Sequence, residues 1–409
     1  MKILKIGKLF AVAAIFSVTC FAAPAKNSGT TFAADALKPW VENGQLPGAI
    51  SILHNNGVEE IACVGYADVA KKRPITLDDV YMQCSQTKGF CGVTVAILVE
   101  EGKLKLDDPV SKYLPEVKNL WVLDSNTNGV KVLKRAQNVL TVRMIMNHTG
   151  GFPFELPAKQ ANIKGGGCSG GMPLRSVAAE AAALPILFEP GTKVQYSNTG
   201  IDIGAAVVEV ITGKKWEDFL AERVLKPLGM TSSTFWPTDK QLETQIEMYR
   251  CVKDKPAEYM VQNNMQQRPY NGSHVFASAG GGLWTTARDQ VKFYKMLMNL
   301  GMGENGVRIL KEETVKSILA VSTRPQKLGG YSLGLATPLY DNENAWFGHG
   351  GAWGTNCSVN YHKKQLKLWV CQLCGHPRPW DQAWKSVGDK FFSTKTDNSG
   401  TEAYTGRVK

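Results

Sequence analysis

A serine and a lysine three residues apart are the residues of this chain best suited to nucleophilic catalysis. Ser85-Gln86-Thr87-Lys88 is the only Ser-x-x-Lys among 409 residues. Residues three apart share a face of a helix, so we expect the Ser85 hydroxyl to lie within reach of the Lys88 amine. Serine attacks once a neighbouring base removes its proton, and burial lowers the pKa of a lysine toward that task. The alternative is an N-cap serine followed by a surface lysine.

Tyr196-Ser197-Asn198 follows a turn-like Glu-Pro-Gly and could supply further polar groups. A tyrosine near a lysine can share its proton, and the phenolate is a competent general base. Asn198 could orient that lysine or bind a substrate amide. A second Tyr-x-Asn occurs at residues 340–342, where it is typical of a turn. Tyr196 could also be an ordinary half-buried aromatic residue.

His349-Gly350-Gly351 precedes Ala352 and a strand-like segment. Paired glycines allow a substrate backbone to approach closely, which predicts a binding edge at Gly350 and Gly351. The imidazole could contact a substrate carboxylate or polarise the base. The amide of Ala352 could donate a hydrogen bond to a developing oxyanion. The alternative is an ordinary turn.

The elements around these motifs predict an α+β fold. Apolar runs at both ends of the chain alternate with turn signals, as in β-hairpins, and helical patterns lie between them. We therefore expect one antiparallel sheet formed by both termini and flanked by helices, with a mostly helical inserted subdomain. The predicted hairpin strands are 49–53 with 60–65 and 358–361 with 366–373, the helices are 85–101, 201–212 and 286–300, and the surface excursions are 121–138 and 155–175.

The N-terminus has the order of features of a secretory signal. Three lysines precede an apolar stretch, Leu9 to Phe21, and Ala23-Pro24-Ala25 offers a small-x-small cleavage site. A short core helix and a lipid anchor on Cys20 are the alternatives. We expect export to a periplasm or the medium. No apolar run reaches the roughly 18 residues of a spanning helix, so we expect no transmembrane segment after signal removal.

Composition excludes several other classes. With 44% apolar residues and 20% charged residues the chain is typical of a globular protein. Its net charge of +11 is spread out, which does not favour nucleic-acid binding, and we expect a small-molecule or peptide substrate. Cys371-x-x-Cys374 lacks a second half-site for a metal, and residues 165–170 match a dinucleotide motif without its preceding strand, so no metal or cofactor is predicted. Eight mature cysteines allow 105 pairings, which the sequence does not resolve.

The three motifs in this order resemble the serine β-lactamase and penicillin-binding-protein superfamily, most of all class C β-lactamases and their relatives, the DD-peptidases and esterases. Other segments also resemble that superfamily over about residues 36–392. These segments are 65–68 with 73–76, 100–104 with 106–110, 144–151 and 279–289.

The resemblance implies that Ser85 is acylated and that Lys88 and Tyr196 form the base system. It also implies that Asn198 and His349 shape the substrate site and that the amides of Ser85 and Ala352 form the oxyanion hole. Most β-lactamases and DD-peptidases have lysine where this chain has His349. Cys84 and Cys91 around the nucleophile are also unusual, and the excursions at 121–138 and 155–175 are expected to remodel the cleft rim.

The expected organisation is a signal peptide (1–25), a linker (26–35), a hydrolase domain (36–392) and a polar tail (393–409). The favoured function is an exported serine hydrolase that forms an acyl-enzyme on an ester, amide or β-lactam bond. The alternative is a penicillin-binding-like sensor that acylates slowly or not at all. The oligomeric state stays open.

Overall fold

The computed structural model describes residues 31–156, 173–260, 274–320, 330–337 and 342–393. Its helices are α1 (Phe32–Glu42), α2 (Thr87–Glu100), α3 (Val142–Met146), α4 (Val177–Ala182), α5 (Asn198–Thr212), α6 (Trp216–Leu220), α7 (Asp239–Leu242), α8 (Ala287–Met298), α9 (Glu312–Ala320) and α10 (Asp381–Ser393). Its strands are β1 (Gly48–Asn55), β2 (Val58–Asp68), β3 (Arg73–Pro74), β4 (Tyr81–Met82), β5 (Trp121–Thr127), β6 (Val130–Arg135), β7 (Tyr249–Arg250), β8 (Glu258–Tyr259), β9 (Trp284–Thr285), β10 (Phe347–Gly351), β11 (Thr355–Asn360), β12 (Gln365–Val370) and β13 (Leu373–Cys374).

The main sheet joins the two ends of the chain, as the sequence predicts. Its six strands have the order β10-β11-β12-β1-β2-β3, and every neighbouring pair is antiparallel. The β1–β2 and β11–β12 hairpins lie where the turn signals place them, and β1 pairs with β12 from Ile50 opposite Val370 to Asn55 opposite Gln365. The α+β class and the sheet built from both termini are confirmed.

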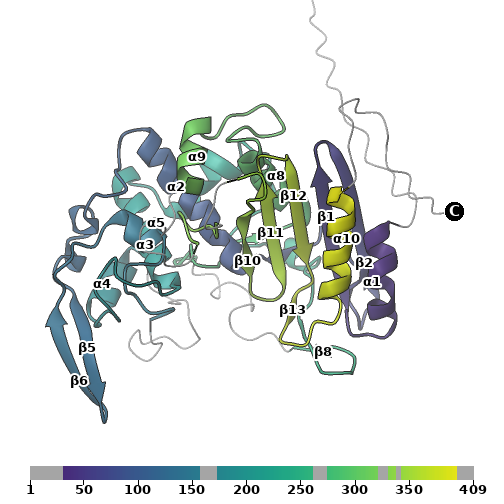
Figure 1. The fold of residues 1–409 in the computed structure, drawn as a ribbon, viewed down its shortest axis with the longest axis horizontal. Coiled ribbons are helices and arrows are strands. Elements are labelled where there is room, and N and C mark those ends of the chain that lie inside the picture. Colours follow the sequence, from purple (N-terminus) through teal and green to yellow (C-terminus); the bar gives the residue numbers. More distant parts are fainter. Residues whose placement is uncertain (1–30, 157–172, 261–273, 321–329, 338–341, 394–409) are drawn as a thin grey trace, which may run out of the picture.

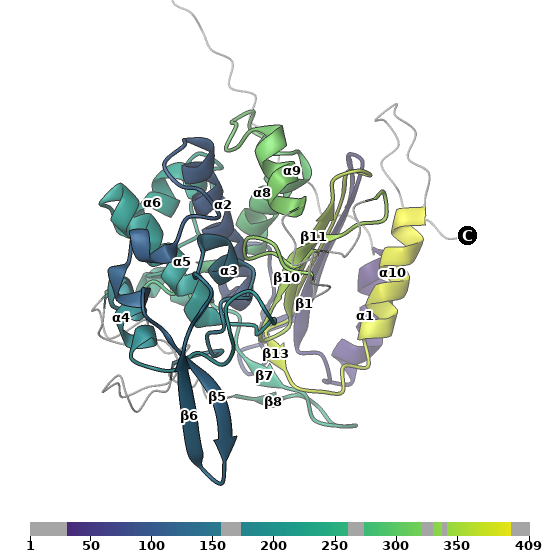
Figure 2. The ribbon, with the colours of Figure 1, turned by 60° about the vertical axis from the view of Figure 1, so that its left-hand side comes forward.

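Helices cover both faces of this sheet, which gives a three-layer arrangement (Figure 1). On one face α1 and α10 lie side by side, and on the other lie α8, α2 and the remaining helices (Figure 2). Successive side chains of a strand point to opposite faces, so Ile50 and Ile52 enter the large helical core while Ala49 and Leu53 pack in the smaller cluster of α1 and α10. Burial on both faces explains why all of β1 is buried.

Helices α2 and α5 carry residues expected to do chemistry, and α8 packs against the main sheet. A 3₁₀ turn, Cys84–Gln86, precedes α2. α5 begins three residues before the predicted start, because the Ser197 side chain caps it by accepting a hydrogen bond from the amide of Gly200. Gly213 ends α5 in the left-handed conformation at φ 66°. Thr286 caps α8 through the amide of Asp289, as its Thr-x-x-Asp pattern predicts.

Two segments that we expected to be a linker and a surface excursion contain regular secondary structure. α1 begins at Phe32, inside the segment 26–35 that we expected to be a linker, with Thr31 as its N-cap. The 121–138 excursion contains a hairpin, β5–β6, that projects from the body of the molecule (Figure 1). Of the described helices, none combines the length and apolarity needed to cross a bilayer.

Several expectations concern residues outside the described ranges. These are the signal segment 1–25, most of the 155–175 excursion with its glycine motif at 165–170, the Tyr-Asp at 340–341 and the tail beyond residue 393.

Candidate active site

Ser85 is the accessible residue of the tight turn that leads into α2. Its neighbours Cys84 and Gln86 are buried, and Cys84 has a left-handed φ of 53°, a conformation uncommon for a residue with a side chain. The Thr87 hydroxyl donates to the Cys84 carbonyl (2.7 Å) and accepts from the amide of Leu283 (3.2 Å). The turn is therefore held from both sides with the Ser85 side chain partly exposed.

Lys88 is completely buried, and its amine is directed at Ser85. Nζ donates to Ser85 Oγ (3.1 Å), Asn198 Oδ1 (2.6 Å) and the carbonyl of Gly280 (2.6 Å). These three acceptors match the three N–H bonds of an ammonium. A neutral amine would keep the bonds to Asn198 and Gly280 and present its lone pair to the Ser85 hydroxyl. The spacing prediction for these two side chains is thus confirmed in geometry.

Tyr196 lies over the same amine. The Lys88 Nζ is 4.6 Å from the centre of the tyrosine ring, within the range of a cation–π contact. Burial raises the pKa of Tyr196, and a hydrogen bond with Ser85 opposes this shift only in part. Because the neutral phenol is favoured, Tyr196 can pass a proton during a reaction, but a phenolate is not its resting form.

His349 lies beside Tyr196 and is the buried middle residue of β10. Its Nδ1 is hydrogen-bonded to the carbonyl of Gly350, which requires a proton on Nδ1 and leaves Nε2 as an acceptor. The Tyr196 hydroxyl, 3.3 Å from Nε2, therefore donates to it. Burial, with a smaller contribution from the charge of Lys88, lowers the pKa of His349 to about 4. This imidazole is neutral at physiological pH.

The glycines after His349 bring β10 against the nucleophile turn. A Cβ on Gly351 would lie 2.3 Å from the Gln83 carbonyl and 2.1 Å from Thr355 Oγ1, whereas a Cβ on Gly350 would come no closer than 3.5 Å to another atom, Asn356 Nδ2. The close approach therefore depends on Gly351. This close approach brings the end of β10 next to the turn that carries Ser85. Ala352, the residue that follows β10, is exposed.

Asn198 is the first residue of α5 and connects two charged groups. Its Oδ1 accepts from Lys88, and its Nδ2 donates to Glu155 Oε1 at 3.0 Å. Burial raises the pKa of Glu155, opposed by the hydrogen bond from Asn198 and the charge of Lys88. A Cβ on Gly280 would come within 3.0 Å of the Asn198 side chain. The carbonyl that binds Lys88 thus packs directly against this asparagine.

The sequence analysis did not identify Glu155 or Asp202 as site residues. Asp202 is fully enclosed one helical turn after Asn198, where Oδ1 accepts from the Gly280 amide (2.9 Å) and from the Ser278 hydroxyl (3.2 Å). Burial raises the pKa of Asp202 to about 7, although these hydrogen bonds oppose the shift. The i, i+4 spacing from Asn198 could have indicated Asp202, but no local pattern distinguishes Glu155.

Aromatic rings surround Tyr196, and the sequence motifs did not indicate this arrangement. The ring of Tyr196 lies 4.6 Å from that of His148, 5.9 Å from Phe154 and 5.7 Å from Tyr331, measured between centroids. Phe154 is half exposed and nearly parallel to Tyr196. The site therefore combines a polar centre with an aromatic wall.

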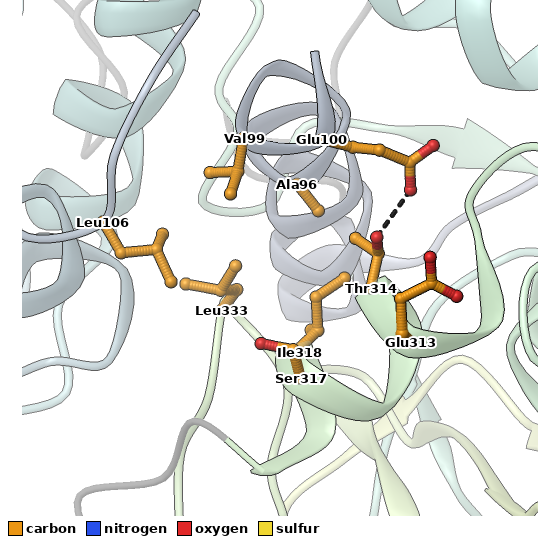
Figure 3. A pocket seen from close by; sticks show the side chains of 9 residues that line it. All are labelled: Ala96, Val99, Glu100, Leu106, Glu313, Thr314, Ser317, Ile318 and Leu333. Atoms are coloured by element: carbon orange, nitrogen blue, oxygen red, sulfur yellow. Dashed lines mark hydrogen bonds between the residues drawn. The ribbon is translucent and has the colours of Figure 1, made fainter. Parts of the chain in front are cut away.

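A separate pocket of about 200 Å³ lies between the C-terminal part of α2 and α9 (Figure 3). Glu100 at its edge accepts from the Thr314 hydroxyl at 2.6 Å. None of the residues expected to do chemistry lines it, so it is not the location of Ser85. Its lining consists of Ala96, Val99, Glu100, Leu106, Glu313, Thr314, Ser317, Ile318 and Leu333. Over the described ranges, no group of three or more acidic, histidine or cysteine side chains could hold a metal.

Comparison with known proteins gives one family. The sequence profile described as Beta-lactamase matches residues 33–364. Protein Rv1367c of Mycobacterium tuberculosis is 29% identical over 278 residues, which span 67% of each chain. Protein flp of Staphylococcus aureus is 26% identical over 230 residues, and the match covers 56% of this chain but only 43% of flp.

Two solved structures share the fold. EstCE1, described as a hydrolase with promiscuous acyltransferase activity, superposes with a TM-score of 0.70 at 19% identity, covering 88% of this chain and 97% of that one. Unliganded simvastatin synthase from Aspergillus terreus has a TM-score of 0.69 at 18% identity, again covering 88% and 97%. At these identities the likeness establishes the fold alone.

Proposed function

The chain belongs to the beta-lactamase family, and from that premise we propose that it is an exported serine hydrolase that forms an acyl-enzyme on Ser85. The observation that carries this proposal is the contact of Ser85 Oγ with a buried lysine amine at 3.1 Å. The same amine lies under the ring of Tyr196 and is held by Asn198 and Gly280. This constellation has the parts of an activated nucleophile: a hydroxyl, a base within reach and groups that orient the base.

The first step is attack by Ser85 Oγ on the carbonyl carbon of the substrate. The hydroxyl proton passes to Lys88 in its neutral form, whose two N–H bonds stay with Asn198 and the Gly280 carbonyl. The carbonyl oxygen becomes an oxyanion, which the amides of Ser85 and Ala352 stabilise. Each such donor contributes roughly a hundred- to a thousandfold in rate.

Departure of the leaving group needs a proton, and Tyr196 is placed to supply it. Its phenol is neutral in the resting site and lies between Lys88 and His349. Tyr196 gives its proton to the leaving oxygen or nitrogen and regains one from the protonated Lys88. Water then attacks the ester of Ser85 by the reverse route and frees the enzyme.

The charges at the site favour one class of substrate over another. A β-lactam or a D-alanyl peptide carries a carboxylate, which a permanent cation would recognise. His349 occupies the position of that cation in the resemblance and is neutral, with a pKa of about 4. We therefore favour ester or amide substrates that lack this carboxylate over β-lactams.

The proposal is tested by measuring hydrolysis of p-nitrophenyl butyrate by the purified protein and its labelling by a fluorophosphonate. We expect hydrolysis and a covalent adduct located on Ser85 by mass spectrometry, and we expect Ser85→Ala to lose both. Ser386→Ala, whose hydroxyl lies on exposed α10, is the matched control and should retain both. An adduct without turnover would favour the sensor alternative, whereas turnover that survives in Ser85→Ala would contradict both.

Export is proposed from residues 1–25 and has its own test. Expression of the full chain should yield a mature protein that begins after Ala25 and is found in the periplasm or the medium. Retention of the intact N-terminus in the cytosol would refute this part of the proposal without affecting the hydrolase.

A further inference from the structure

Glu155 places a partly buried carboxylate beside the proposed catalytic residues, where the charge of Lys88 acts on it across the side chain of Asn198. Its Oε1 accepts from Asn198 Nδ2, and among the described residues it forms no ion pair with a lysine, arginine or histidine. Burying a carboxylate without a direct ion pair is costly, so such a group is retained where it has another task. Burial already raises the pKa of Glu155, which is a sign of that cost.

The basic groups that we place at the site cannot serve an anionic substrate. The ammonium of Lys88 is completely buried, and three acceptors take up its three N–H bonds. His349 is neutral, with Nδ1 bonded to Gly350 and Nε2 facing the hydroxyl of Tyr196. Among the site residues that the structure describes, the charge that remains for an incoming molecule is therefore the negative charge of Glu155.

Aromatic rings gather around the residue that directly precedes Glu155 in the chain. Phe154 is the residue before Glu155, is 48% exposed, and lies nearly parallel to the ring of Tyr196. Tyr331 adds a third ring 5.7 Å from Tyr196. Aromatic faces attract cations through their negative electrostatic surface, and a carboxylate at their edge strengthens that attraction.

We infer that the site takes acyl substrates that carry a positively charged nitrogen, and that Glu155 with the aromatic ring of Phe154 binds this group. The inference rests on the proposed hydrolase function. It names the substrate class of the same site: esters or amides of cationic acids, recognised by charge at one end and cleaved by Ser85 at the other.

A purely orienting role for Glu155 is the competing explanation. By accepting from Asn198 Nδ2, Glu155 turns the amide oxygen of Asn198 toward Lys88. Glu155→Gln separates the two roles, because the glutamine carbonyl can still accept from Asn198 while the negative charge is gone. Glu155→Lys reverses the charge and gives a second, independent measurement.

The experiment compares two p-nitrophenyl esters of nearly equal shape, 4-(trimethylammonio)butyrate and 5,5-dimethylhexanoate. Each kcat/KM is divided by the rate constant for hydroxide hydrolysis of the same ester, which removes the intrinsic reactivity. We expect the wild-type ratio, cationic over neutral, to exceed ten. The ratio should fall at least tenfold in Glu155→Gln and drop below one in Glu155→Lys. Glu313→Gln, an exposed carboxylate of the α2–α9 pocket, is the matched control and should keep the wild-type ratio.

The outcomes are distinguishable. Ser85-dependent hydrolysis of the neutral ester with no preference for the cationic one would overturn this inference and leave the proposed hydrolase intact. Equal losses on both esters in Glu155→Gln would show that Glu155 only orients Asn198, which also overturns it. If neither ester is hydrolysed and no fluorophosphonate adduct forms, both proposals fail together.

Discussion

Substituting Gly351 by alanine tests how closely β10 must approach the nucleophile turn. The added Cβ would lie 2.3 Å from the Gln83 carbonyl, two residues before Ser85, and 2.1 Å from Thr355 Oγ1. Neither separation is possible for real atoms, and one of the two contacts is with backbone, which has no rotamer to change. The strand and the turn must therefore move apart, and this separates the two amides that we propose as oxyanion donors, those of Ser85 and Ala352.

The size of the effect follows from what is lost. Misplacing one oxyanion donor costs about a hundred- to a thousandfold in kcat. Overpacking at a tight contact costs about 1–3 kcal/mol of unfolding free energy. We thus expect Gly351→Ala to remain folded at 25 °C with a lowered melting temperature and a kcat for p-nitrophenyl butyrate reduced by roughly a hundredfold or more. Steady-state kinetics, the rate of fluorophosphonate labelling and thermal unfolding measure these quantities.

Two neighbouring glycines provide controls within the same strand. A Cβ on Gly350 meets its nearest atom, Asn356 Nδ2, at 3.5 Å, so Gly350→Ala should reduce kcat by less than tenfold. A Cβ on Gly348 would lie 2.2 Å from the Cys357 carbonyl of β11, so Gly348→Ala should destabilise the sheet without displacing the turn. The reasoning is refuted if Gly351→Ala keeps the wild-type kcat. It is also refuted if kcat, corrected for the folded fraction, falls as much in Gly348→Ala as in Gly351→Ala.

Three further predictions concern charged groups. The pKa of Asp202 is raised by burial to about 7, above its unfolded value, so its contribution to stability is present at low pH and is lost as the pH rises from about 4 through 7. Asp202→Asn should therefore flatten the fall in melting temperature across this window, and an unchanged pH profile would count against the assignment. Burial opposes ionisation of Glu59, but hydrogen bonds to His54 and Lys295 outweigh it and lower the pKa of Glu59 to about 2. The ionised Glu59 therefore stabilises the folded state above about pH 4.5, and this stabilisation is lost as the pH falls toward 2. Glu59→Gln should lower the free energy of unfolding, measured with urea, by about 1–3 kcal/mol at pH 7 and by much less near pH 2. His349→Lys should raise kcat/KM for an anionic ester, such as the p-nitrophenyl monoester of adipic acid, at least tenfold relative to a neutral ester, and equal changes on both esters would show that residue 349 does not select charge.

Much of the scaffold could be predicted because the signals are local. The β1–β2 and β11–β12 hairpins follow from alternating apolar residues around polar turns, and the ends of α5 and α8 follow from Gly213 and the Thr286 cap. The β5–β6 hairpin was predicted only as a surface excursion. Its six β6 residues are all exposed, so no buried face imposes the alternation that would identify a strand.

Some residues of the proposed site could also be predicted from local sequence signals, and others could not. Ser85 and Lys88 are three residues apart at a helix start, and this spacing by itself brings the hydroxyl and the amine together. The ordered motifs also indicated Tyr196, Asn198 and His349. Glu155 carries no such signal, because its contact with Asn198 spans 43 positions and depends on how the loop that carries Glu155 packs against the start of α5.

The sequence by itself determined which side chains could do chemistry and where their supporting elements begin and end. Only the tertiary structure decided their charge and hydrogen-bonding states. Lys88 meets its second and third acceptors across 110 and 192 positions, and burial keeps Tyr196 and His349 neutral. Contacts between neighbours three or four residues apart follow from helix geometry, whereas the free energy of a charge depends on the solvent it loses and on the partners that the whole fold brings to it.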